Sequence, residues 1–192
     1  MTTIAVVRKN GYAAIAADTM TKWGSGKETA EYIINHSKIL KVGSTYIGVT
    51  GSATFKTILQ DYFGRSRAYA RFDTPFEIFK TWHKLHAALK QEYFLVTGHS
   101  EEDVLESSRM DALIINARGI FGVAAHRTVQ EFSKFYAFGS GGDFAMGSMH
   151  STYAEPGRSA ESVARAAIEA AAEFDDSTGL PADCFTVKLA RR

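Results

Sequence analysis

The chain has 192 residues, the length of one ordinary domain and enough for a large buried core. Hydrophobic residues make up 45% and charged residues 22%, and a formal net charge of +1 argues against a nucleic-acid partner. The single cysteine, Cys184, excludes an intrachain disulfide framework. With no apolar run of membrane-spanning length, we expect a cytoplasmic protein with no membrane partner, folded as one domain over residues 1–192.

The first half of the chain predicts two hairpins followed by two helices. The expected strands are Thr2–Arg8 with Tyr12–Ala17 around Asn10-Gly11, and Lys38–Val42 with Thr45–Val49. A polar loop is expected from Thr19 to Thr29 between these hairpins. The expected helices are Ala53–Phe63 and one that starts near Thr74-Pro75, where threonine can cap and proline suits the first turn.

On the second of these helices, apolar and histidine residues recur at helical spacing and predict a buried stripe. Its members are Phe76, Phe79, Trp82, His83, Leu85, His86, Leu89 and Tyr93. His83 and His86 could share a metal, but the apolar residues around them favour core or interface positions, and we expect no metal site.

In the second half, we expect a hairpin and a further strand, then two helices, then a final strand. Residues Gly98–Arg109 are expected to be irregular, with room for a helical turn at Asp103–Ser107. The other expected elements are strands Asp111–Asn116, Ile120–Ala125, Glu131–Tyr136 and Asp183–Leu189 and helices Asp143–His150 and Arg158–Phe174.

Because the strands come in hairpins and not singly between helices, the sequence favours antiparallel sheets. We therefore expect an α+β fold, in which two antiparallel sheets stack face to face between two helical layers, as a four-layer αββα sandwich.

The first two residues, Met1-Thr2, carry a possible chemistry. Removal of Met1 by methionine aminopeptidase would leave Thr2 with a free α-amine beside its own hydroxyl. Such an amine has a pKa of about 7.7–8.0, so near neutral pH it can act as the base for that hydroxyl. An ordinary processed terminus is the alternative, and the rest of the chain must decide between them.

Several short motifs along the chain resemble those of the proteasome β-subunit family, the threonine peptidases of the N-terminal nucleophile hydrolase fold. They are Thr2-Thr3-Ile4, Ala16-Ala17-Asp18, Lys38-Ile39, Val49-Thr50-Gly51, Phe138–Gly142 and Asp175–Gly179. The chain looks most similar to the bacterial HslV group, and the longer Gly98–Arg109 segment resembles the HslV-derived offshoot called the betaproteobacterial proteasome homologue (BPH).

This resemblance implies that Thr2 is the nucleophile and Lys38 the charged lysine beside it. A fixed ammonium would favour an alkoxide and keep the neighbouring amine neutral. Asp18 matches the aspartate that pairs with this lysine. A surface lysine and a turn-capping aspartate are the plainer interpretations of the same two positions.

The resemblance implies supporting roles for four further residues. Gly51 matches the backbone donor of the oxyanion hole, although Ser52 stands where the family often has a second glycine. Ser140 matches a serine near the terminal amine, and Asp175 and Thr178 match the acid and hydroxyl that support it. As alternatives, Gly-Ser-Gly-Gly could bind phosphate, and the stretch that starts at Asp175 could be a loop at a helix C-terminus. Because Asp175 and Asp176 are adjacent, the match to the acid also has two registers, one with each aspartate.

By the same resemblance, Thr21, Lys22 and Trp23 line a cleft that aligns the substrate as an added strand, with Lys22 and Trp23 departing from the usual small residues. Val49 matches the pocket residue before the oxyanion turn and suggests a medium apolar preference.

The function implied is a threonine endopeptidase that cleaves peptides or unfolded proteins inside a homo-oligomeric double ring of twelve or fourteen subunits, without a cofactor. The usual partner of the family is a ring-shaped AAA+ ATPase unfoldase. Two alternatives are a non-catalytic ring or scaffold subunit and an amidohydrolase that acts on a small amide. The scaffold interpretation is disfavoured by the joint presence of Thr2, Asp18 and Lys38 and by a chain that begins at its first strand.

Overall fold

The computed structural model describes residues 2–66, 69–97 and 104–190. Its strands are β1 (Thr3–Lys9), β2 (Tyr12–Asp18), β3 (Thr21–Trp23), β4 (Gly26–Glu28), β5 (Ile39–Val42), β6 (Thr45–Val49), β7 (Ala112–Asn116), β8 (Gly119–Val123), β9 (Val129–Phe132), β10 (Phe135–Gly139) and β11 (Ala182–Lys188). Its helices are α1 (Thr54–Ser66), α2 (Pro75–Gln91), α3 (Gly142–Thr152) and α4 (Ala160–Phe174). None of the described helices has the length and apolar character needed to cross a membrane.

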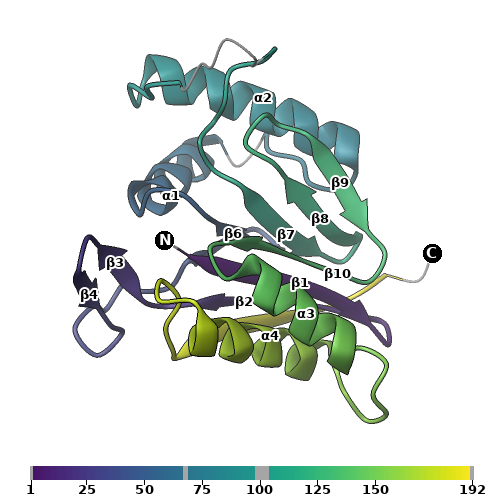
Figure 1. The fold of residues 1–192 in the computed structure, drawn as a ribbon. Coiled ribbons are helices and arrows are strands. Elements are labelled where there is room, and N and C mark those ends of the chain that lie inside the picture. Colours follow the sequence, from purple (N-terminus) through teal and green to yellow (C-terminus); the bar gives the residue numbers. More distant parts are fainter. Residues whose placement is uncertain (1, 67–68, 98–103, 191–192) are drawn as a thin grey trace.

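Two antiparallel sheets stack between two pairs of helices (Figure 1). The four-stranded sheet has the order β10-β1-β2-β11, and the five-stranded sheet has the order β5-β6-β7-β8-β9. Helices α1 and α2 cover the five-stranded sheet, and α3 and α4 cover the other. The expected four-layer αββα sandwich is therefore confirmed.

The apolar residues form three layers between these four. Along β1 the side chains alternate, with Ile4 and Val6 between the two sheets and Ala5 and Val7 against α3 and α4. Since both faces of β1 are buried, its sequence is a continuous apolar run. Alanines dominate the contact between the four-stranded sheet and α4, and their small side chains let the helix approach the sheet closely.

Helix α2 starts where the sequence predicted. The Thr74 hydroxyl accepts a hydrogen bond from the Glu77 N–H, and Pro75 occupies the first turn.

The stripe predicted on α2 is only partly correct. Trp82, Leu85, His86 and Leu89 are buried, together with Ile78. Phe76, Phe79 and His83 instead lie on the exposed side of the helix, with 63% of Phe76 accessible. The spacing of these three residues is helical as well, so the sequence contains two apolar faces that periodicity alone merged into one.

Two other expectations were wrong. The polar loop from Thr19 to Thr29 contains a small hairpin, β3–β4, which extends from one end of the sandwich (Figure 1). The single strand expected over Glu131–Tyr136 is two strands, β9 and β10, that belong to different sheets. The chain crosses between the sheets at Ser133-Lys134, a step that leaves no glycine or proline signal in the sequence.

Part of the predicted irregular segment, residues 98–103, lies outside the described residues, and so does the start of the helical turn considered at Asp103–Ser107. The described remainder has no helix and is attached to α2. His86 contacts Ser108 Oγ through Nδ1 at 2.9 Å and Glu106 Oε2 through Nε2 at 3.2 Å. His86 is therefore a buried, hydrogen-bonded histidine, as expected, whereas His83 is exposed and stacks on Phe79.

The pairing of β1 with β10 places Gly139 opposite Thr3 and depends on glycine. Gly139 has a φ of +108°, and a Cβ there would lie 1.8 Å from the Thr2 carbonyl oxygen. Gly139→Ala should therefore lower the free energy of unfolding by about 2 kcal/mol or more. Gly147→Ala, an exposed helical position with nothing within 4 Å, should raise it by about 0.5–1 kcal/mol. Urea unfolding of both variants checks the opposite signs, and equal effects would contradict the role given to Gly139.

Candidate active site

Thr2 lies directly before β1, at the end of a strand that is held on both sides. Its carbonyl oxygen accepts a hydrogen bond of 3.1 Å from the Ser140 N–H. Only 7% of Thr2 is accessible, although it borders a cleft. Met1 lies outside the described residues.

Asp18, the last residue of β2, is completely buried beneath this terminus and accepts hydrogen bonds from several segments. Its Oδ1 accepts from the Thr3 N–H at 3.0 Å and from Lys38 Nζ at 2.7 Å. Its Oδ2 accepts from the backbone N–H groups of Met20 and Gly179, each at 3.2 Å. The carboxylate thus fixes both the start of β1 and the position of the lysine.

Lys38 precedes β5 and reaches from the five-stranded sheet to the end of the four-stranded sheet. Burial lowers the pKa of the Lys38 ammonium, and the attraction of Asp18 opposes this shift. Burial raises the pKa of Asp18, and the contact with Lys38 opposes that shift as well. Each charge in this pair is therefore sustained by the other.

Gly51 lies in the turn between β6 and α1, on the rim of the same cleft. It has a φ of +97°, and a Cβ there would lie 2.7 Å from the Arg109 carbonyl oxygen, so the turn requires glycine. The neighbouring Thr50 N–H donates to the Asp111 carbonyl oxygen at 2.9 Å, which attaches the turn to β7. Ser52 accepts a hydrogen bond from the Thr54 N–H at 3.4 Å at the start of the helix.

A row of hydroxyl and carboxylate groups lies on the other side of the terminus. Asp175 Oδ2 accepts from Ser140 Oγ at 2.7 Å and from Thr178 Oγ1 at 2.5 Å. Thr178 Oγ1 lies 2.6 Å from Thr3 Oγ1, which also accepts from the Gly141 N–H. Of the two registers that the sequence left open, Asp175 is therefore the one that contacts Ser140 and Thr178.

Asp176 points elsewhere and makes a 2.5 Å ion pair with Lys22 of the β3–β4 hairpin. This contact with Lys22 lowers the pKa of Asp176. It also joins the loop after α4 to the hairpin across one side of the cleft.

The cleft has a volume of about 640 Å³ and brings together most of the residues selected from the sequence. Seven of them border it: Thr2, Thr21, Lys22, Trp23, Lys38, Val49 and Gly51. The other four, Asp18, Ser140, Asp175 and Thr178, lie behind Thr2 and contact its neighbours or one another. Trp23 is 55% exposed at the mouth of the cleft.

Thr3 was not predicted as a site residue, yet it joins the two networks around the terminus. Its N–H donates to Asp18, and its hydroxyl lies in the row that leads to Asp175. The available signal in the sequence was a polar residue directly before the apolar run Ile4-Ala5-Val6-Val7, since a polar group at the start of a buried strand needs a hydrogen-bond partner. Within the described residues, no group of three or more His, Cys, Asp or Glu side chains is placed to hold a metal ion.

Comparison with known proteins gives two solved structures at high similarity. The Thiobacillus denitrificans BPH in complex with epoxomicin is 55% identical, covers 98% of this chain and 100% of its own, and has a TM-score of 0.93. A second structure of Thiobacillus denitrificans BPH is 56% identical, covers 99% and 100%, and has a TM-score of 0.94. No protein-family model and no curated protein matches the chain.

A more distant solved structure, the eukaryotic HslV from Trypanosoma brucei, is 18% identical with a TM-score of 0.67. It covers 97% of this chain and 99% of its own, so the fold is shared along the whole length. The fold is that of the N-terminal nucleophile hydrolases, as the sequence motifs implied. With more than half of its residues identical over nearly its full length, the chain belongs to the family of the betaproteobacterial proteasome homologue.

Proposed function

We propose that this protein is a threonine-type endopeptidase that hydrolyses peptide bonds in peptides or unfolded proteins. The observation that carries the proposal is that Thr2, Lys38 and Gly51 border one cleft, with Asp18 buried behind them. A nucleophile, a cation and a backbone donor thus border the same cleft, the set of groups that acyl transfer requires. The structure of Thiobacillus denitrificans BPH in complex with epoxomicin supports the proposal, because it shows that a relative of this chain binds a small ligand.

In the first step, the Thr2 hydroxyl oxygen attacks the carbonyl carbon of the scissile bond and its proton passes to the free α-amine of the same residue. The resulting tetrahedral oxyanion accepts a hydrogen bond from the Gly51 N–H. The intermediate collapses when the C–N bond breaks and the protonated α-amine gives its proton to the departing amine. The N-terminal half of the substrate remains as an ester on Thr2.

In the second step, water attacks the ester carbonyl carbon while the α-amine accepts a proton from it. Collapse of this intermediate breaks the bond between the carbonyl carbon and the Thr2 oxygen, which takes the proton from the protonated α-amine. A carboxylic acid is released, and the Thr2 hydroxyl and the neutral amine are restored. Both steps use the free α-amine of Thr2 as the base, so they require that Met1 has been removed.

Lys38 supplies positive charge throughout this cycle. Its ammonium stabilises negative charge on the Thr2 oxygen and disfavours protonation of the nearby amine. The row Ser140–Asp175–Thr178 holds the opposite side of the terminus and can exchange protons with the amine through Ser140. The Ser140 N–H donates a hydrogen bond to the Thr2 carbonyl oxygen, so the backbone of Ser140, and with it the Ser140 side chain, is fixed next to Thr2.

The substrate binds as an extended strand along β3. Strand β3 pairs with β4 alone in the described two-stranded sheet, so its other edge is available for backbone hydrogen bonds. Thr21, Lys22 and Trp23 form this edge, and Val49, which borders the same cleft, contacts the side chain of the cleaved residue.

We further propose that the chain assembles as a homo-oligomeric double ring of twelve or fourteen copies in the cytoplasm and works with a ring-shaped AAA+ ATPase. Membership of the proteasome-type family supports the ring. Phe76 and Phe79 on the exposed side of α2 offer apolar surface suited to contacts between copies.

Replacement of the nucleophile tests the proposal directly. Thr2→Ala keeps the amine but has no hydroxyl, so kcat/KM for peptide cleavage should fall by about 10³-fold or more. Thr2→Ser keeps both groups and should retain measurable cleavage. Light scattering should show the wild-type assembly size for both variants. Cleavage by Thr2→Ala at the wild-type rate would exclude Thr2 as the nucleophile.

Removal of the cation should affect kcat more than binding. Lys38→Met leaves Asp18 without its ion-pair partner, and burial then raises the pKa of this carboxyl further. We expect kcat to fall by about 10²-fold or more, on the scale of losing a charged group beside the developing charge. Lys22→Met, on the substrate edge, should raise KM instead. Steady-state kinetics of both variants distinguish the two roles, and similar kcat values would contradict the one given to Lys38.

The pH dependence of activity follows from two groups, the Thr2 α-amine and the Lys38 ammonium. Activity should rise as the Thr2 amine loses its proton below about pH 8 and fall again as Lys38 loses its own. Because burial lowers the pKa of Lys38, the alkaline fall should come below about pH 10.4, the ordinary value for lysine. The measurement is kcat/KM against pH, with circular dichroism to show that the fold persists. Full activity beyond the ordinary lysine pKa would contradict this assignment.

A further inference from the structure

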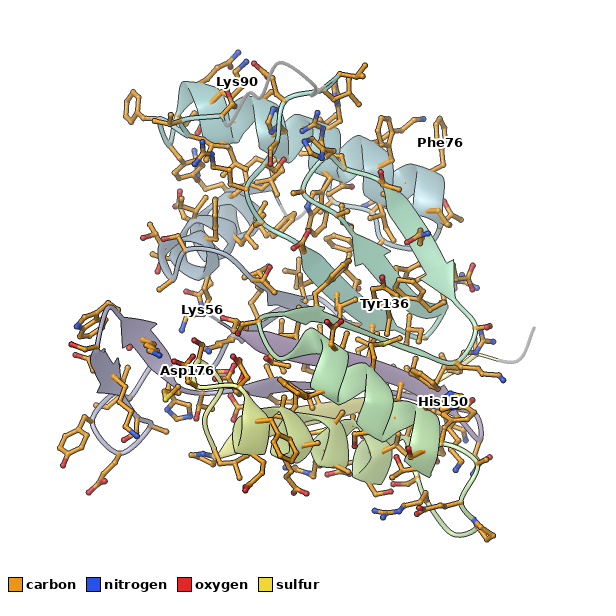
Figure 2. The ribbon with its side chains drawn as sticks, viewed as in Figure 1. Lys56, Phe76, Lys90, Tyr136, His150 and Asp176 are labelled. Carbon is orange, nitrogen blue, oxygen red and sulfur yellow. The ribbon has the colours of Figure 1, made fainter. Side chains whose placement is uncertain are left out.

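The cleft contains a third lysine that the proposed mechanism does not use. Lys56, the third residue of α1, borders the cleft together with Lys22 and Lys38. Figure 2 shows Lys56 extending from α1 toward the side on which Asp176 and the loop after α4 lie. Lys56 is therefore placed to contact a ligand that binds in the cleft between these elements.

The three lysines differ in their partners. Lys22 and Lys38 each form an ion pair with a carboxylate, Asp176 and Asp18 respectively. Lys56 donates a hydrogen bond to the neutral backbone carbonyl of Asn35. Within the described part of the chain, no carboxylate lies within ion-pair distance of Lys56, so its charge is the least compensated of the three.

The surroundings of Lys56 also favour an incoming carboxylate. Burial lowers the pKa of this lysine, while Asp183 opposes the shift from beyond contact distance. A partly desolvated ammonium gains more from a carboxylate than an exposed one does, because less water screens the interaction. Glu28 is the one acidic residue on the described lining of the cleft, and it lies on β4, the outer strand of the hairpin.

Lys56 lies near the Gly51 turn, where the mechanism places the carbonyl of the substrate residue that is cleaved. Ala53, Lys56 and Thr57 all border the cleft, and their spacing of three and four residues places them on one face at the start of α1. This face follows the Gly51 turn directly. A side chain on the residue whose carbonyl is held at Gly51 would therefore enter the part of the cleft that Val49 and this face border.

We propose that Lys56 makes the cleft select peptides with an acidic side chain at the residue whose carbonyl is attacked. The inference rests on the proposed function and adds the substrate class. Glutamate suits the arrangement better than aspartate, since its longer apolar stem can pack on Val49 and Ala53 before its carboxylate reaches Lys56.

The test compares two peptides that differ only in glutamate or glutamine at the cleaved residue, an isosteric pair that isolates the charge. The Met1-free wild-type protein should show a kcat/KM about tenfold higher for the glutamate peptide, the scale of one charge-assisted hydrogen bond. Lys56→Met should bring the ratio close to one, and Lys56→Glu should reverse it. Lys84→Met, an exposed lysine on α2 away from the cleft, should keep the wild-type ratio.

The ratio cancels any general loss of activity in a variant. Lys56→Gln, which retains a donor for the Asn35 carbonyl, provides a second neutral variant if Lys56→Met does not fold. A wild-type ratio near one, or an unchanged ratio in Lys56→Met, would overturn the assignment to Lys56 while leaving the peptidase intact. Cleavage of neither peptide by the Met1-free wild type would instead overturn the proposed function, and the inference with it.

Discussion

The buried contact between Asp18 and Lys38 is the interaction on which the rest of the site depends. A carboxylate that is fully buried at a strand end is costly unless its charge is compensated. Here one ammonium and three backbone N–H groups provide that compensation, and they come from four different segments of the chain. The same bonds that make this charge tolerable also set the position of the chain terminus.

A second network completes the position of the terminus from the other side. The row from Thr3 through Thr178 and Asp175 to Ser140 connects the start of β1 with the loops after α4 and β10. The glycines around it serve this close approach, since a Cβ on Gly141 would lie 2.7 Å from Thr3 Oγ1. Thr2 is therefore held between two polar networks and also borders the cleft.

The layered fold could be predicted because its local signals are strong. Asn10-Gly11 and Gly43-Ser44 mark hairpins, and the apolar run of β1 marks a strand that is buried on both faces. The sequence could not distinguish positions that share a local pattern but have different tertiary partners. Trp82 and Phe79 are both aromatic residues at helical spacing, yet only Trp82 faces the sheet.

Members of the candidate site could be predicted where a residue belongs to a short motif. They could not be predicted where only a tertiary contact shows which residue takes part. Thr2, Asp18, Lys38 and Gly51 stood out as members of short motifs, and the structure places them together. The choice between Asp175 and Asp176 depended on which carboxylate turns toward Ser140, and two adjacent identical residues cannot reveal this. Lys56 resembles any surface lysine on a helix until the cleft beside it is seen.

In the proposed mechanism, Thr2 supplies both the attacking oxygen and the proton acceptor. The most direct measurement is mass spectrometry of the active protein after reaction with a peptide epoxyketone, a reagent that can bond to a hydroxyl and to a free α-amine. We expect a protein without Met1 and an adduct located on Thr2. A fully active protein that retains Met1, or an adduct on any other residue, would contradict it.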